Sequence, residues 1–268
     1  MKIEKFINYT KIKISSLGNP FYFTKFNNEE TKSKFLFFMK NGFLDLGKIL
    51  SDEECLIINN KINMMIEKKD AKFLQSQNIW KIEKCDNFID VINKVLNKNL
   101  FSIFKNYFKC KYFISDFDVR RVLASSYEDV LKFGNSNSDW HKDTRGKQIK
   151  MMIYLTPVTK TDSYFSLIPG TQKNITLNFK ESRFEEGKVN TKKEVKFLSN
   201  EKGRAIIFDT NVIHRLNRNA KSNIRDTMTI NFTAGQYLKQ IYHGSLDNIQ
   251  DAKLKKLITD NSLLEKRI

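Results

Sequence analysis

The sequence predicts a mainly β fold of the α+β class, with helices filling the first part of the chain and short strands the second. Apolar residues recur at helical spacing up to about residue 110. From residue 112 onward, short runs of β-branched and aromatic residues alternate with polar residues and are separated by turn signals. With 268 residues, 40% of them hydrophobic, the chain is long enough for one domain with a substantial core. The simplest arrangement is one antiparallel sandwich or barrel with helices packed outside it.

In the first part of the chain, three helical patterns follow an irregular lead-in over residues 1–27. The predicted helices span residues 28–40, 51–69 and 86–108, and a short alternating strand at residues 43–46 separates the first two. Asn41-Gly42 supplies a C-cap for the first helix. Ser51 followed by Glu54 forms a capping box at the start of the second. The apolar stripes of these helices predict faces that pack against the strands.

In the second part of the chain, alternating segments predict a series of short strands. They span residues 112–126, 149–155, 164–168, 194–198, 203–209, 212–216 and 226–233, with a further strand around residues 140–143. Pro157 and Pro169 stop two of these strands. Residues 180–194 are charged and turn-like, and residues 247–264 have a helical pattern.

The formal net charge of +17 raises the question of a nucleic-acid partner. Such a partner would be indicated by a basic run or patch. Here the cations are mostly lysines spread along the whole chain, so a general compositional bias is the better interpretation and a nucleic-acid partner is not expected. The charge remains compatible with a small anionic substrate.

The composition also bears on the compartment. The mean hydropathy is −0.48 and no run of about 18 apolar residues occurs, so no membrane span is predicted. The first nine residues lack the continuous apolar segment of a signal peptide. The three cysteines, Cys55, Cys85 and Cys110, lie far apart, which predicts reduced thiols and a cytoplasmic protein.

The segment Trp140-His141-Lys142-Asp143 carries the clearest chemical signal. On a strand, residues two apart point to the same face, so His141 and Asp143 would present an imidazole and a carboxylate side by side. If His214 arrives from a second strand, two histidines and one carboxylate occupy one face of a metal. This facial triad suits non-haem Fe(II) and leaves open positions for a co-substrate and O₂. A His-x-Asp pair alone also occurs by chance in many proteins, so the residues downstream decide its meaning.

A possible carboxylate anchor follows the second histidine. Arg225 lies eleven residues after His214 (225 − 214 = 11), and Thr227 follows it on the same face of a predicted strand. An arginine fork and a neighbouring hydroxyl group offer two parallel charge-assisted hydrogen bonds and a third bond to a terminal carboxylate. A diacid that chelates Fe(II) through its keto-acid end needs such an anchor at its far end.

With these residues in order, the segment from Trp140 to Thr233 resembles the phytanoyl-CoA dioxygenase family of Fe(II)- and 2-oxoglutarate-dependent oxygenases. The matching features are the His-x-Asp strand, the turn Ile168-Pro169-Gly170-Thr171-Gln172-Lys173, the strand Gly203–Asp209 leading into His214, and Arg225. The resemblance covers about the last 130 residues well and the first 110 weakly. The chain departs from the family at Gln172, where the turn has histidine, and at Asp162-Ser163-Tyr164.

The resemblance implies a fold and a reaction. It implies one oxygenase domain, with a mostly helical part over residues 1–110, a double-stranded β-helix (jelly-roll, cupin-like) core over 111–240 and a C-terminal helix over 241–268. It implies oxidative decarboxylation of 2-oxoglutarate to succinate and CO₂, coupled through O₂ to hydroxylation of the substrate. His141, Asp143 and His214 would be the Fe(II) ligands and catalytic residues. Arg225 and Thr227 would hold the distal carboxylate of 2-oxoglutarate.

For several other residues, the sequence leaves open whether they line the cavity or have a structural role. An aromatic residue often faces 2-oxoglutarate in this family, and Met152 or Tyr154 would take its place. Arg121 is expected to contact the substrate or co-substrate, with an ion pair to Asp116 or Asp118 as the alternative. Trp140 either lines the substrate pocket or packs in the core. Lys142 and Lys150 are expected to be solvated, and His243 to lie on the surface or in the tail.

The expected substrate is a small molecule, such as a sugar or another anionic metabolite. Acyl-CoA is the family's namesake substrate, but nothing in the sequence identifies a CoA site. Two alternatives come from other classes: a non-catalytic jelly-roll binding protein, and an oxygenase that modifies nucleic acids. The first need not keep all three ligands and Arg225, and the second needs a basic, aromatic groove around the iron.

Overall fold

The computed structural model describes residues 25–26, 28–83, 85–110, 112–126, 128–129, 138–143, 147–173 and 182–234. Residues 1–24 of the predicted lead-in, the helix predicted at residues 247–264 and His243 lie outside this part of the chain. Within it, no helix is both long enough and apolar enough to cross a membrane.

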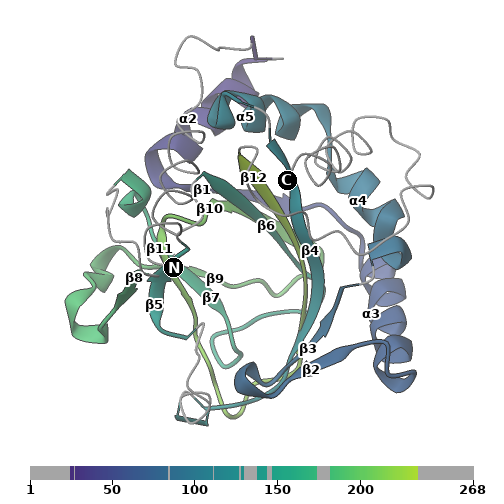
Figure 1. The fold of residues 1–268 in the computed structure, drawn as a ribbon. Coiled ribbons are helices and arrows are strands. Elements are labelled where there is room, and N and C mark those ends of the chain that lie inside the picture. Colours follow the sequence, from purple (N-terminus) through teal and green to yellow (C-terminus); the bar gives the residue numbers. More distant parts are fainter. Residues whose placement is uncertain are drawn as a thin grey trace, which may run out of the picture.

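The strands of the described residues form two antiparallel sheets that face each other (Figure 1). The larger sheet has the order β1 (Phe43–Lys48), β10 (Arg204–Asp209), β6 (Gln148–Tyr154), β12 (Arg225–Ala234), β4 (Tyr112–Val122), β3 (Ile79–Ile82) and β2 (Lys72–Leu74). The smaller has the order β8 (Ser182–Phe184), β5 (Trp140–Lys142), β11 (Ile213–Leu216), β7 (Phe165–Ile168) and β9 (Val195–Phe197).

The chain passes repeatedly between the two sheets. It runs from β4 in the larger sheet to β5 in the smaller, to β6 in the larger, to β7, β8 and β9 in the smaller, and then to β10, β11 and β12 in alternate sheets, so most neighbouring strands from β4 onward are not consecutive in sequence. This is the winding of a double-stranded β-helix, the eight-stranded jelly roll. The predicted fold class is therefore confirmed, and every strand predicted from residue 112 onward is present with its ends shifted by a few residues.

The helices cover one end of the barrel and the outer face of the larger sheet (Figure 1). They are α2 (Glu29–Asn41), α3 (Asp52–Glu67), α4 (Ile89–Val95) and α5 (Lys98–Phe108). The predicted C-cap is Gly42, whose φ of 78° is left-handed and whose N–H donates to Phe38 O. The predicted capping box is also confirmed, because Ser51 Oγ accepts from Glu54 N and the Glu54 carboxylate accepts from Ser51 N.

The helix predicted at residues 86–108 is divided into two helices in the structure. The pattern from residue 86 to 108 breaks between α4 and α5, where Leu96 has an extended conformation with ψ at 100°. The Asn97 side chain accepts from the N–H groups of Asn99 and Leu100 and caps α5. The apolar spacing continues across the break, so the break does not show in the hydrophobic pattern.

The two faces of the larger sheet have different partners. On β12, Met228, Ile230 and Phe232 belong to the main core, which packs the sheet's outer face against the helices. The residues between them point into the space between the two sheets. A second apolar cluster, including Tyr154, Phe165 and Phe197, closes part of that space. The rest of it is a polar cavity.

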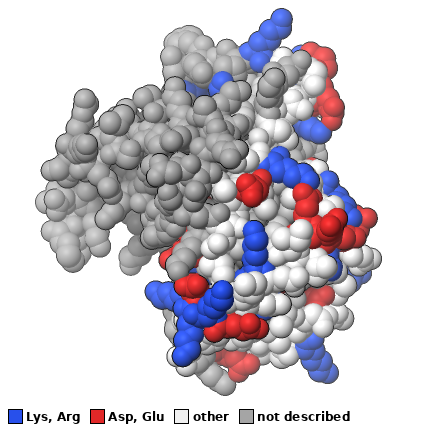
Figure 2. Space-filling view, turned by 90° about the vertical axis from the view of Figure 1, so that its right-hand side faces the viewer, with Lys and Arg blue, Asp and Glu red and all other residues white. Residues whose placement is uncertain are grey.

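The charged side chains on the α3 side of the molecule are mixed in sign. Figure 2 shows Lys and Arg side chains interspersed with Asp and Glu on this face. Several form ion pairs, such as Lys48 with Asp52 and Lys94 with Glu54. On this face, the net positive charge of the chain is not gathered into one basic patch.

Candidate metal centre

The three predicted metal ligands come together between the two sheets. His141 on β5 and His214 on β11 are directly opposite each other in neighbouring antiparallel strands. Their ring centroids are 4.2 Å apart. Asp143 follows β5, and one ligand atom from each of the three side chains lies within 4.8 Å of the other two. Strand register therefore produces the arrangement that the spacing predicted.

Backbone carbonyl groups orient both imidazoles. His141 Nδ1 lies 2.8 Å from Asp139 O, and His214 Nδ1 lies 2.9 Å from Val212 O. Because a carbonyl oxygen only accepts, each Nδ1 carries the proton and donates it. Each neutral ring then has an unprotonated Nε2, which is the atom available to a metal.

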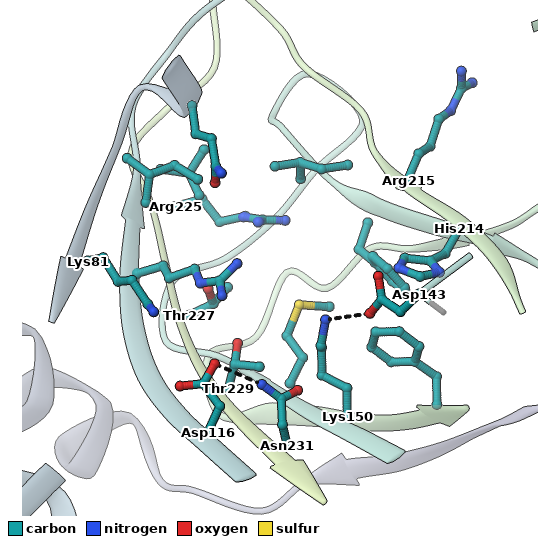
Figure 3. A pocket seen from close by; sticks show the side chains of 18 of the residues that line it. Lys81, Asp116, Asp143, Lys150, His214, Arg215, Arg225, Thr227, Thr229 and Asn231 are labelled. Atoms are coloured by element: carbon teal, nitrogen blue, oxygen red, sulfur yellow. Dashed lines mark hydrogen bonds and ion pairs between the residues drawn. The ribbon is translucent and has the colours of Figure 1, made fainter. Parts of the chain in front are cut away.

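The Asp143 carboxylate divides its two oxygens between different partners. Oδ1 is 3.8 Å from His141 Nε2, and Oδ2 accepts a hydrogen bond from Lys150 Nζ at 3.2 Å. The Asp143 backbone N–H donates to Thr210 O at 2.9 Å, which fixes the residue beyond the end of β5. Figure 3 shows Lys150 and Asp143 joined in this way beside His214. One carboxylate oxygen is thus directed toward the histidines.

The protonation states suit a metal. Burial, and after it the nearby His141, lower the pKa of His214 to about 3. Burial alone would raise the pKa of Asp143, but Lys150, His214 and His141 outweigh it, so this pKa is lowered. At neutral pH the site offers a neutral His214 and an ionised carboxylate, the states that metal binding requires. The donor set of two imidazoles and one carboxylate therefore fits Fe(II).

A cavity of about 660 Å³ opens beside the three residues. Both sheets line it, with His141 and His214 from the smaller sheet and β3, β4, β6 and β12 from the larger. Its volume lies in the range of small-molecule sites.

Arg225 and Thr227 lie on the wall of this cavity away from the histidines (Figure 3). The Arg225 side chain is buried, and its Nε and Nη1 have no hydrogen-bond partner among the described residues. Burial lowers the pKa of the Arg225 guanidinium. A buried guanidinium with unused donors is costly unless an anion binds to it. Arg225 therefore lies in the cavity wall with donors that an anionic group could use, as the predicted carboxylate anchor requires.

Of the two residues proposed for the aromatic position, Met152 lines the cavity. Tyr154 packs in the second apolar cluster, and its hydroxyl group donates to Phe197 O at 3.1 Å.

The cavity-facing member of the arginine pair on β4 is Arg120, and the choice of Arg121 was wrong. Arg121 points to the outer face, where Nε and Nη2 each donate to the Asp226 carboxylate at 2.8 Å and Nη1 donates to Asn63 of α3. Arg120 lines the cavity and makes a two-pronged ion pair with Asp118. The alternative of an ion pair between Arg121 and Asp116 or Asp118 is therefore also wrong, because Arg121 pairs with Asp226 and Asp118 pairs with Arg120.

Trp140 lies in the core and not in the substrate pocket, and two lysines differ from expectation. Trp140 is 0% exposed, packs with Ile168 and Val189 away from the cavity lining, and is covered by the Arg215 guanidinium. This agrees with the core alternative. Neither lysine is solvated: Lys142 is buried and donates to Thr171 O at 2.6 Å, and Lys150 reaches Asp143. Lys150 faces the cavity, whereas Lys142 lies on the face of β5 opposite His141 and is buried against the turn at Thr171.

Three cavity or near-cavity residues were not predicted. Asp116 on β4 accepts from Asn231 on β12 at 3.1 Å through Oδ2, while its buried Oδ1 has no hydrogen-bond partner among the described residues (Figure 3). Burial, together with the charge of Asp118, raises the pKa of Asp116. Arg218 lies in the loop after β11. On β4, Asp116 points to the same face as Arg120, and on β12, Asn231 points to the same face as Arg225. The alternation of side chains along a strand would therefore have placed both in the cavity once the directions of the two arginines were known.

Comparison with known proteins supports the fold. No protein-family model matches the chain, and no curated protein sequence matches it. Among solved structures, the epimerase SnoN in complex with Fe³⁺, alpha ketoglutarate and nogalamycin RO has a TM-score of 0.58 at 8% identity, over 78% of this chain and 85% of that chain. HygX from Streptomyces hygroscopicus, with nickel and 2-oxoglutarate bound, has a TM-score of 0.55 at 10% identity, over 76% and 87%. AviO1 from Streptomyces viridochromogenes Tue57 has a TM-score of 0.52 at 14% identity, over 81% and 100%. At these identities the similarity shows a shared fold.

Proposed function

We propose that this chain is an Fe(II)- and 2-oxoglutarate-dependent dioxygenase that hydroxylates a small molecule and releases succinate and CO₂. One observation carries the proposal: two histidines and an aspartate converge on one side of a cavity whose other side holds a buried arginine without a partner. SnoN and HygX, which share the fold, were crystallised with Fe³⁺ and with nickel, respectively, and both with 2-oxoglutarate, which supports a metal and this co-substrate as the ligands here.

In this proposal, His141 and His214 bind the metal through Nε2, and Asp143 binds it through one carboxylate oxygen. Bound iron, 2-oxoglutarate and O₂ together supply the oxidation of a substrate C–H bond. The chain's contribution is to orient the ligands through the carbonyls of Asp139 and Val212. Because Asp143 supplies a carboxylate ligand, no metal position is left for a halide, which favours hydroxylation over halogenation.

Arg225 and Thr227 hold the distal carboxylate of 2-oxoglutarate. They lie on β12 of the larger sheet, while the histidines lie on the smaller sheet. The co-substrate would therefore extend across the cavity from one sheet to the other. Arg225 and Thr227 are buried, which limits the water around the ion pair that would form at Arg225 and so strengthens that pair.

The substrate is proposed to be a small molecule that carries hydroxyl groups, as a sugar does. Asp116 Oδ1 is a buried acceptor in the cavity wall, and it needs a donor. The cations Lys81 and Lys150 already have acidic partners, Glu83 and Asp143. This pairing favours a hydroxylated substrate over an anionic one. SnoN and HygX were crystallised with nogalamycin RO and hygromycin B, respectively, which supports a small-molecule substrate.

The test is metal binding and succinate release. We expect the wild type to bind one Fe(II) per chain and to release succinate only with Fe(II), 2-oxoglutarate and O₂. Asp143→Asn and His214→Ala should each weaken metal binding by about 100-fold, since each removes one of three ligands, and should abolish succinate release. Asp90→Asn, an exposed change in α4, is the matched control. A wild type that binds no Fe(II), or variants that release succinate normally, would overturn the proposal.

The same assay separates the two alternatives. A non-catalytic binding protein of this fold would release no succinate with any substrate. A nucleic-acid oxygenase would retain DNA or RNA strongly at low salt and lose it steeply as salt rises. The mixed charges of the face in Figure 2 do not favour that partner.

A further inference from the structure

We infer that Arg218 is a second arginine of the anion-binding end of the cavity, so that Arg218 and Arg225 together hold the distal carboxylate of the co-substrate. This inference rests on the proposed function. It adds a residue that neither the sequence motif nor the shared fold indicates, and it makes that residue a determinant of co-substrate choice.

The surroundings of Arg218 place it beside the Arg225 end of the cavity, next to Gln77 and behind the residues that line the cavity. Arg218 Nη2 donates to Gln77 O at 2.8 Å, and Gln77 lines the cavity. Arg225 lies directly opposite Val122 in the β12–β4 pairing, and Val122 lies opposite Ile79 in the β4–β3 pairing. Gln77 is two residues before Ile79, in the turn that enters β3. Both guanidinium groups therefore reach the same end of the larger sheet.

Each of the two arginines has hydrogen-bond donors without a partner. Nε and Nη1 of Arg218, and Nε and Nη1 of Arg225, are buried and have no hydrogen-bond partner among the described residues. Native structures rarely leave buried donors unpaired, and a charged group pays the largest penalty. Four such nitrogens at one corner indicate that a ligand completes the site.

The charges of the two groups point to an anionic ligand. Burial, and after it the nearby charge of Arg225, lower the pKa of Arg218 to about 9. The two arginines that line the cavity together with Arg225 are already paired, Arg120 with Asp118 and Arg215 with Glu186. An anion between Arg218 and Arg225 would relieve their repulsion and satisfy their donors together.

A carboxylate matches this number of donors. Its two oxygens offer about four acceptor positions, and arginine presents its donors as a planar fork. The metal end of the cavity recognises the 2-oxo acid group, which monoacids and diacids share. The Arg218–Arg225 corner would recognise the second carboxylate, which only the diacid has.

The test compares two ligands that differ in that group. Binding of 2-oxoglutarate and of 2-oxopentanoate, which has the same chain length without the distal carboxylate, is measured by calorimetry on the Ni(II)-loaded protein. For Arg218→Gln we expect 2-oxoglutarate to bind about tenfold more weakly or worse, because a charge-assisted hydrogen bond is lost. Binding of 2-oxopentanoate and of Ni(II) should not change. Lys221→Gln, which removes an exposed cation from the same loop, should leave all affinities unchanged.

A thermal melt without ligand separates recognition from a structural role. Arg218→Met removes a buried, incompletely paired charge and should keep or raise the Tm of the ligand-free protein. A lower Tm, with both acids weakened equally, would mean that Arg218 only anchors the turn at Gln77, and would overturn the inference. Unchanged 2-oxoglutarate binding in Arg218→Gln would also overturn it and leave the proposed function intact. If the wild type itself binds no 2-oxoglutarate, the proposed function fails and the inference with it.

Discussion

Two adjacent residues, Arg120 and Arg121, have opposite roles because a strand alternates its faces. The sequence predicts that one of them points into the cavity, but it does not say which one. That choice depends on which face of β4 the helices cover, and this is set by contacts such as Arg121 with Asn63 of α3. The sequence alone therefore predicts that the two side chains point in opposite directions. Only the tertiary structure shows which of them points into the cavity.

Arg121 should matter for stability and not for ligand binding. Its partner Asp226 has a side chain only 2% exposed, so Arg121→Gln leaves a buried carboxylate without its ion pair. We expect the free energy of unfolding in urea to fall by about 3 kcal/mol. Lys48→Gln, which breaks an exposed pair with Asp52, should cost less than about 1 kcal/mol. A stable Arg121→Gln protein with weakened 2-oxoglutarate binding would show instead that Arg121 faces the cavity.

The candidate site could be predicted where its residues lie in strands and follow a motif. His141, Asp143 and His214 were identified from order and spacing, and the structure brings them together. Lys150 and Arg218 were not assigned to the site. The sequence around Lys150 predicts a strand but not the strand's neighbours, and Arg218 lies in a loop that has no periodicity to interpret. Residues that act through tertiary contacts leave no local signal.

At the level of elements, the sequence predicted regular segments well and their interruptions poorly. The break between α4 and α5 depends on one capping side chain, Asn97, within a continuous apolar stripe. The hairpin of β2 and β3 was not predicted, because its strands are three and four residues long. Short pairings of this kind are stabilised by their neighbours in the sheet more than by their own sequence.

Gly203 is the backbone position on which the start of β10 depends. Its φ is +79°, and an added Cβ would lie 2.1 Å from Leu50 O. We expect Gly203→Ala to lower the free energy of unfolding by about 4 kcal/mol, combining the left-handed conformation with a backbone clash. Gly47 is the matched control, since its φ is +71° and nothing lies within 4 Å of an added Cβ.

Gly47→Ala should therefore cost only about 1–2 kcal/mol, the penalty of the left-handed conformation. Urea denaturation of the two variants measures the difference. Equal losses of stability would show that the close approach of Leu50 to Gly203 does not contribute.

At the scale of the whole molecule, the proposed metal and co-substrate would bind to residues of both sheets. The proposed metal ligands His141 and His214 belong to the smaller sheet, and the proposed carboxylate-binding residues Arg225 and Thr227 belong to the larger. A co-substrate bound to both ends would link the two layers of the barrel. Ligand binding should then stabilise the whole fold and not one loop.

Thermal unfolding should report this link. A ligand at about 100 times its Kd stabilises the native state by about 2.7 kcal/mol, which corresponds to a Tm rise of roughly 5–10 °C for a chain of this size. We expect Ni(II) with 2-oxoglutarate to raise Tm by this amount, and 2-oxoglutarate alone to raise it little. In His214→Ala the combined effect should disappear. A full shift from 2-oxoglutarate without metal would contradict the arrangement.

The direct opposition of His141 and His214 across two strands has a consequence for ion selectivity. The separation of the two rings is set by backbone spacing and by carbonyl contacts, so the protein offers a fixed template to any ion that prefers imidazole. Divalent nickel, copper and zinc bind such nitrogen donors more tightly than ferrous iron does. Mismetallation by these competitors is therefore expected whenever they are abundant, and the occupancy of the centre will follow metal supply in the surroundings more than any discrimination by the polypeptide.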